Sequence, residues 1–170
     1  MTNSLLNSTK LLEPNDSPRH FLSHRRHRWL VWSLLAVSPL GFLDATYLSL
    51  EHYLNRAPPC SLTNGCEIVT TSSYSLLFGI PVALLGAAYY LFIIIGLIYY
   101  LDSKKPFVIK WVSRLTAAGF IFSIYLVYLQ VAVLHAICLY CMLSALSSTA
   151  LFILGLMVLK SHRVFERRSA

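Results

Sequence analysis

The chain has 170 residues, of which 56% are hydrophobic and only 12% are charged, and its mean hydropathy is +0.63. Soluble domains contain about 25% charged residues, so the composition excludes an ordinary soluble domain and indicates a membrane protein. The formal net charge of +7 does not favour a nucleic acid partner, because nearly all basic residues gather near the two ends of the chain and around one connection between apolar stretches.

Four apolar stretches are long enough to cross a bilayer, which requires about 20 helical residues. They cover residues 29–50, 77–101, 107–134 and 137–160. We therefore predict an all-α membrane protein with a four-transmembrane-helix bundle in residues 29–160. The polar residues 1–28 are predicted to form a disordered cytoplasmic tail, and residues 161–170 a second one. The first stretch is too long for a cleaved signal peptide and lacks a clear cleavage site, so we expect an uncleaved signal-anchor.

The basic residues predict the orientation of this bundle. Every Lys and Arg except Arg56 precedes the first stretch, surrounds the connection at 102–110, or lies at or after the end of the last stretch. Such residues accumulate on the cytoplasmic side of a membrane. Both termini are therefore expected in the cytoplasm and the loop at 50–76 outside, as in a bacterial inner membrane protein that faces the periplasm.

Asp44 lies well inside the first apolar stretch. A carboxylate at the centre of a transmembrane helix costs about 2.5–3.5 kcal/mol even on the mildest scale. The residue must lie near the outer interface, be protonated or find a partner in the bundle. A structural polar contact and a proton-carrying role both remain open.

The outer loop starts at Pro58 and Pro59, which end the first helix. Cys60 and Cys66 follow, with the turn-forming pair Asn64-Gly65 between them. From Glu67 the segment is polar on one side and apolar on the other, which predicts a short helix lying as a cap on the membrane surface. Pro81 is expected as an early residue of the second helix.

The third stretch ends near His135, and the fourth begins almost at once with Cys138-Leu-Tyr-Cys141. So short a connection predicts an antiparallel helix pair and brings the second cysteine pair to the outer face. All four cysteines of the chain are then on the outer side, where disulfides persist.

Two close cysteine pairs at one membrane face can transfer electrons. A Cys-x-x-Cys pair at a helix N-terminus has a lowered cysteine pKa, and thiolates exchange with disulfides through mixed intermediates. We expect the Cys60/Cys66 loop to meet a protein partner and the Cys138/Cys141 pair to meet a quinone dissolved in the bilayer. Alternative interpretations are purely structural disulfides, small buried apolar cysteines, and a zinc site that includes His135. The spacing is unusual for zinc, so no metal is predicted.

The sequence resembles the vitamin K epoxide reductase family over about residues 30–160. The resemblance rests on three segments: Cys60-x5-Cys66-Glu-Ile-Val-Thr-Thr-Ser72, Phe-Gly79-Ile-Pro81-Val-Ala-Leu-Leu-Gly86, and Ala136-Ile-Cys138-Leu-Tyr-Cys141. It implies a four-helix bundle around a quinone, with a loop and a short helix that cap the pocket.

The resemblance also implies roles for individual residues. Cys141 would react with the quinone, with Cys138 as its disulfide partner. Cys66 would exchange with Cys138, and Cys60 would form the mixed disulfide with a thioredoxin-like protein. Ser72 would support these cysteines, although it is equally a capping or turn serine.

Two departures from the family pattern refine the expected function. Many bacterial relatives carry a fused thioredoxin-like domain, whereas this sequence ends shortly after the bundle, so a separate periplasmic thioredoxin-fold partner is expected. The animal enzymes hold the vitamin with an Asn and a Tyr where this sequence has Val82 and Ala145. An ordinary respiratory quinone, ubiquinone or menaquinone, is therefore favoured as the acceptor over vitamin K epoxide.

Three alternatives to this function remain. One is an animal-type vitamin K epoxide reductase, and another is a non-catalytic tetraspan scaffold stapled by disulfides. The third is the other bacterial disulfide-forming tetraspan family, in which the Cys-x-x-Cys pair comes in the first outer loop. This sequence has the reverse order, which disfavours that family.

Overall fold

The computed structural model describes residues 18–56, 58 and 65–169. The described elements are, in chain order, the helices and strands α2 (Pro18–Tyr53), α3 (Gly65–Thr71), the 3-10 helix η2 (Ser73–Ser75), β1 (Leu76–Leu77), β2 (Ile80–Pro81), α4 (Val82–Ser103), α5 (Pro106–Tyr128), the π-helical turn η3 (Leu129–Val133) and α6 (Leu139–Ser169).

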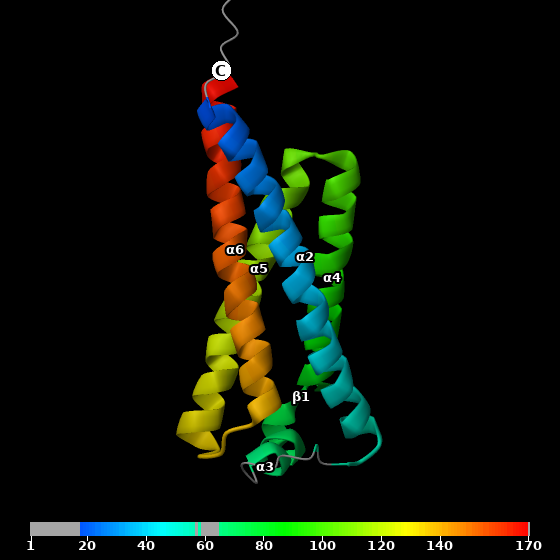
Figure 1. Cartoon of the computed structure of the whole chain (residues 1–170). Coiled ribbons are helices and arrows are strands. Elements are labelled where there is room, and N and C mark those ends of the chain that lie inside the picture. Colours follow the sequence, from blue (N-terminus) through cyan, green and yellow to red (C-terminus); the bar gives the residue numbers. More distant parts are fainter. Residues whose placement is uncertain (1–17, 57, 59–64, 170) are drawn as a thin grey trace, which may run out of the picture.

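Four of the helices are long and apolar enough to cross a membrane. Their candidate spans are Arg28–Tyr53, Val82–Ser103, Pro106–Val133 and Leu139–Ser161. The helices pack as a ring in the order α2, α4, α5, α6, with α6 returning to α2 (Figure 1). The predicted four-transmembrane-helix bundle is thus confirmed. α2 begins at Pro18 and α6 ends at Ser169, so both helices extend into the segments that the sequence assigned to the two tails.

The distribution of apolar side chains is that of a protein in lipid. Leu34, Ile93 and Leu151 are fully buried between the helices. Large apolar side chains also cover the outside, where Phe92 is 65% exposed and Leu146 is 67% exposed. Water would disfavour such a surface, whereas hydrocarbon tails solvate it, because lipid is as apolar as leucine.

Tyr90 joins three of the four helices through the middle of the bundle. A Cβ atom at Gly41 would overlap the Tyr90 ring, so the glycine lets α2 approach α4 closely. On the far side, the Tyr90 hydroxyl donates a 2.9 Å hydrogen bond to the carbonyl oxygen of Ser144 and lies 2.7 Å from the Ser147 hydroxyl. The phenol group is therefore satisfied inside an apolar interior by two residues of α6.

The outer end of the bundle carries α3, η2 and a small hairpin. α3 lies beside the start of α6 (Figure 1), which confirms the predicted capping helix. The hairpin was not predicted: β1 pairs with β2 in antiparallel register, with Leu76 opposite Pro81 and Leu77 opposite Ile80. The prediction that the second span begins at residue 77 was therefore wrong, because the chain reverses at Phe78 and Gly79 before α4 begins at Val82.

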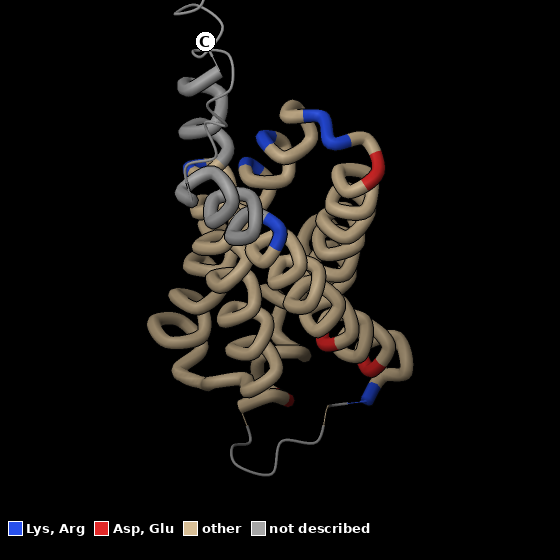
Figure 2. Tube along the Cα trace, turned by 45° about the horizontal axis from the view of Figure 1, so that its top comes forward, with Lys and Arg blue, Asp and Glu red and all other residues tan. Residues whose placement is uncertain are grey.

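Pro81 was expected as an early helical residue, but it precedes α4 in an extended conformation with φ −57° and ψ 128°. Its fixed φ suits both the strand and the helix entry. Figure 2 shows that most of the described basic residues lie toward the end of the bundle where α4 connects to α5, away from α3. Arg56 closely follows the end of α2 at Tyr53, and this end of α2 is on the α3 side of the bundle (Figure 1).

Candidate redox site

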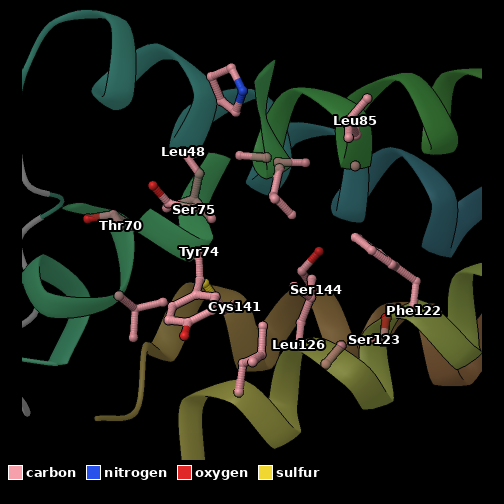
Figure 3. Close-up of a pocket in the computed structure, with 18 of the residues that line it drawn as sticks. Leu48, Thr70, Tyr74, Ser75, Leu85, Phe122, Ser123, Leu126, Cys141 and Ser144 are labelled. Atoms are coloured by element: carbon pink, nitrogen blue, oxygen red, sulfur yellow. The ribbon is translucent and has the colours of Figure 1, made fainter. Parts of the chain in front are cut away.

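A pocket of about 320 Å³ opens between the four helices beneath the capping segment. Cys141 and Ser144 of α6, Phe122 and Leu126 of α5, and Leu85 of α4 surround this space, with the α3–η2 segment over it (Figure 3). The helices contribute mostly apolar side chains to the pocket wall. A small, mostly apolar pocket with hydroxyl groups in its wall suits a flat ring that carries polar oxygens.

The pocket also contains the two positions at which the sequence departs from the animal enzymes. Val82, the first residue of α4, and Ala145 of α6 both line it. Neither side chain can hydrogen-bond to a ligand. The hydroxyl groups in the wall come instead from other residues, namely Thr70, Ser72, Tyr74, Ser75, Tyr89, Tyr90, Ser123, Ser144 and Ser148.

Of the two cysteines of the second pair, only Cys141 lines the pocket. Cys138 is fully buried and lies just before α6, whose first residue is Leu139. Both are free cysteines. The Cys141 backbone N–H points to the Cys138 sulfur at 3.4 Å, so the two residues share the first turn of the helix, as the Cys-x-x-Cys spacing predicts.

The pKa of the Cys138 thiol is lowered from its ordinary value, chiefly by a hydrogen bond with the Cys141 side chain. Backbone hydrogen bonds from Cys141 and Tyr140 lower it further, whereas burial opposes the shift. These backbone groups are the unpaired N–H groups of a helix N-terminus, which stabilise a negative charge. The structure thus supplies thiolate-favouring surroundings at Cys138.

Gln130 holds the segment before Cys138 in place, a role that the sequence did not reveal. Its side-chain Oε1 accepts a 3.0 Å hydrogen bond from the Cys138 backbone N–H. Its carbonyl oxygen accepts a 3.1 Å hydrogen bond from the Ala136 N–H. Gln130 is only 3% exposed. The sole signal in the sequence was an amide side chain near the end of an apolar stretch.

The first residue of α3 packs against the residue before Cys138. A Cβ atom at Gly65 would overlap the Ile137 carbonyl oxygen, so the two backbones touch. Cys66 follows Gly65 directly, is 1% exposed and is disulfide-bonded. The structure therefore brings the start of α3, with Cys66, to the segment that holds Cys138. Cys60 lies outside the described residues.

Ser72 lies at the edge of the pocket, between α3 and η2. Its hydroxyl donates a 2.8 Å hydrogen bond to the Val69 carbonyl oxygen, and its own carbonyl accepts a bond from the Ser75 N–H at 3.0 Å. Ser72 thus closes a local turn that carries the cap over the pocket. Within the described part of the chain, no three His, Cys, Asp or Glu side chains are grouped so that they could hold a metal ion.

Comparison with known families agrees with this geometry. Residues 32–156 match the model of the vitamin K epoxide reductase family. The match covers more than half of the chain and includes α3, the hairpin, the pocket and both cysteines of the second pair. The chain belongs to the vitamin K epoxide reductase family and is an integral membrane oxidoreductase.

Proposed function

We propose that this protein oxidises a thioredoxin-fold partner and passes two electrons to a membrane quinone, thereby supporting disulfide bond formation. Members of the family generally use quinones and work with thioredoxin-like partners. The main support is the separation of the second pair: Cys141 lines the pocket, whereas Cys138 is buried beside the start of α3. This separation supports a different exchange for each cysteine.

The proposed cycle balances in two steps. A reduced Cys60/Cys66 pair attacks a Cys138–Cys141 disulfide through the Cys66 thiolate; the bond between Cys66 and Cys138 forms while Cys141 leaves as a thiolate. Cys60 then attacks Cys66, which closes the loop disulfide and releases Cys138. In the second step the Cys138/Cys141 dithiol loses two electrons and two protons and becomes a disulfide, while the quinone gains both and becomes a quinol.

The disulfide in the loop would be reduced again by the partner. Cys60 would form the mixed disulfide with the thioredoxin-fold protein, whose own dithiol becomes the new disulfide. The structure has Cys66 in a disulfide and the second pair as free thiols.

We propose ubiquinone or menaquinone, rather than vitamin K epoxide, as the electron acceptor. Val82 and Ala145 line the pocket at the positions where the animal enzymes have an Asn and a Tyr, so this pocket lacks those two polar contacts. No metal takes part in the proposed cycle. An animal-type epoxide reductase would instead show turnover with vitamin K epoxide.

We further propose that residues 29–160 form the membrane domain in a bacterial inner membrane, with 1–28 and 161–170 as cytoplasmic tails. The positive-inside rule supports this orientation, because Lys104, Lys105 and Lys110 lie at or near the connection between α4 and α5, at the end of the bundle opposite Cys66 and Cys138. The active site and the partner would then both be on the periplasmic side.

The proposal is tested by measuring quinone reduction by the purified protein with a reduced thioredoxin-fold donor. Cys141→Ala should abolish turnover with short-chain ubiquinone and menaquinone, because it removes the sulfur in the pocket wall. Cys60→Ala should block transfer from the protein donor but leave part of the turnover with a small dithiol. Unchanged turnover in Cys141→Ala would refute the mechanism, and an inactive folded wild-type protein would favour a disulfide-stapled scaffold.

A further inference from the structure

Asp44 has a half-buried side chain that the proposed cycle does not use. It lies in α2 within the candidate span Arg28–Tyr53. Its Oδ2 atom is buried and has no hydrogen-bond partner among the described residues. In the same helix, Thr46 and Ser49 donate hydrogen bonds to the helix backbone, whereas Ser38 Oγ, like Asp44 Oδ2, is buried without a partner among the described residues. The structure thus gives Oδ2 no structural hydrogen bond to account for its burial.

Packing between α2 and α6 places Asp44 at the level of the second cysteine pair. The rings of Tyr47 and Tyr140 are in contact, with centroids 5.3 Å apart, and the two helices run in opposite directions (Figure 1). Asp44 is one helical turn before Tyr47, and Cys141 follows Tyr140. Because the helices are antiparallel, going back from Tyr47 to Asp44 on α2 and forward from Tyr140 to Cys141 on α6 leads in the same direction. That direction is toward the middle of the bundle.

The electrostatic interactions of Asp44 agree with this register. The carboxyl group interacts with Cys138 and Cys141 of α6 and with Tyr90 of α4. These are the titratable groups that interact with it from the helices packed against α2. Ala45 and Leu48, which follow Asp44 on α2, line the pocket together with Cys141. Asp44 itself does not line the pocket, but its chain neighbour Ala45 belongs to the same pocket wall as the reacting sulfur.

Quinone reduction by a dithiol needs a route for protons. Two thiol protons must leave sulfur and two must reach the quinone oxygens, in an interior where free hydroxide and hydronium are scarce. General acid–base catalysis by a positioned carboxyl group contributes about 10²–10⁴-fold to such transfers. Intramembrane carboxyl groups often serve as proton relays.

We propose that Asp44 is the proton-transfer group of the quinone-reducing step. This inference rests on the proposed function. The Asp44 carboxylate takes the proton of the Cys141 thiol, and the resulting thiolate supplies electrons to the quinone as the Cys138–Cys141 bond forms. The second proton comes from the Cys138 thiol. Both protons end on the quinol oxygens, so Asp44 is a carboxylate again after each turnover.

The test is a single-turnover measurement of quinone reduction by the fully reduced protein with short-chain ubiquinone. Asp44→Asn should slow this step about a hundredfold and flatten its dependence on pH, because no group then takes up the proton. Asp44→Glu should restore part of the rate. Asp102→Asn is the matched control, because Asp102 is an exposed carboxylate on α4, and it should react like the wild type. Reduction of the Cys66 disulfide by dithiothreitol should be equal in all variants.

A wild-type rate and pH profile in Asp44→Asn would overturn the assignment while leaving the proposed function intact. Inactive wild-type and Asp102→Asn proteins would instead refute the proposed function and this inference with it. If Asp44→Asn does not fold, the wild type is treated with dicyclohexylcarbodiimide, an apolar reagent for membrane carboxyl groups. Quinone reduction should be lost in step with labelling of the Asp44 peptide, and full activity of the labelled protein would overturn the assignment.

Discussion

Gln130 shows how one side chain controls the position of a reacting residue. Its Oε1 accepts the Cys138 N–H in a buried setting. Gln130→Met keeps the size but leaves that N–H unpaired, which should lower the free energy of unfolding by about 1–3 kcal/mol. The midpoint temperature of thermal unfolding and the rate of exchange between the two cysteine pairs should both fall. Leu129→Met changes a buried neighbour without removing a hydrogen bond and should have a small effect on both; equal losses in the two variants would contradict this role.

The lowered pKa of Cys138 predicts a specific titration. The protein is prepared with the Cys66 disulfide intact and the Cys138/Cys141 pair reduced. Its ultraviolet thiolate absorbance should then persist to a lower pH than that of an ordinary cysteine. Cys141→Ala removes the largest cause of the shift, so the transition should move to higher pH. Cys138→Ala should remove the low-pH signal. A thiolate signal unchanged by Cys141→Ala would show that the hydrogen bond between the side chains is not the cause.

The same shift has a consequence for stability. A thiol whose pKa is lower in the folded state favours folding at a pH above its unfolded pKa, and this contribution is lost as the pH falls through the folded pKa. As the pH falls from the unfolded to the folded pKa of Cys138, the reduced wild type should therefore lose stability relative to Cys138→Ala. The free energy of unfolding of both proteins, measured as a function of pH, checks this.

For individual residues, the sequence predicted those features that depend on spacing along the chain. Cys138 and Cys141 had to share a helical turn because they are three residues apart. Gln130 could not be recognised, since an amide in an apolar stretch indicates only that some partner exists. Its partner is a backbone N–H eight residues away, which becomes accessible only after the chain has turned between α5 and α6.

At the scale of elements, the contact between α3 and α6 should govern the exchange between the two cysteine pairs. Gly65→Ala adds a methyl group where the Ile137 carbonyl oxygen lies, so α3 must move away from α6. Transfer from a reduced thioredoxin-fold donor to quinone should slow by at least tenfold, because misplaced reacting groups react slowly. Quinone reduction by the already reduced second pair should be unchanged. Thr71→Ala, at the exposed end of α3, is the control.

The elements themselves were predicted with unequal success. Length and hydropathy define the four spans, because a helix across lipid needs many consecutive apolar residues. The hairpin before α4 was not predicted, because each of its strands has only two residues. In addition, Leu76, Leu77 and Ile80 are as apolar as the span that follows. Local composition does not distinguish an apolar hairpin from the first turn of a membrane helix.

At the scale of the whole molecule, the pocket could not be located from the sequence without the family resemblance. Its wall combines residues of all four long helices and of the cap, which lie far apart along the chain. Which residues of a membrane helix face lipid and which face the interior depends on how the helices pack. In α6, for example, the adjacent residues Ala145 and Leu146 face opposite surroundings: the first lines the pocket and the second is 67% exposed toward lipid.

This pair of neighbours offers the sharpest test of the pocket. Ala145→Phe places a ring inside a cavity of about 320 Å³, so it should compete with the quinone for space and raise the KM for short-chain ubiquinone by at least tenfold. Reduction of the Cys66 disulfide should not change, because Cys66 does not line the pocket. Leu146→Phe makes a similar change on the same helix but into lipid, and should leave the KM unaltered. If Ala145→Phe reduced ubiquinone as well as Leu146→Phe does, the quinone would have to meet Cys141 by another route, from the lipid rather than through the space between the four helices.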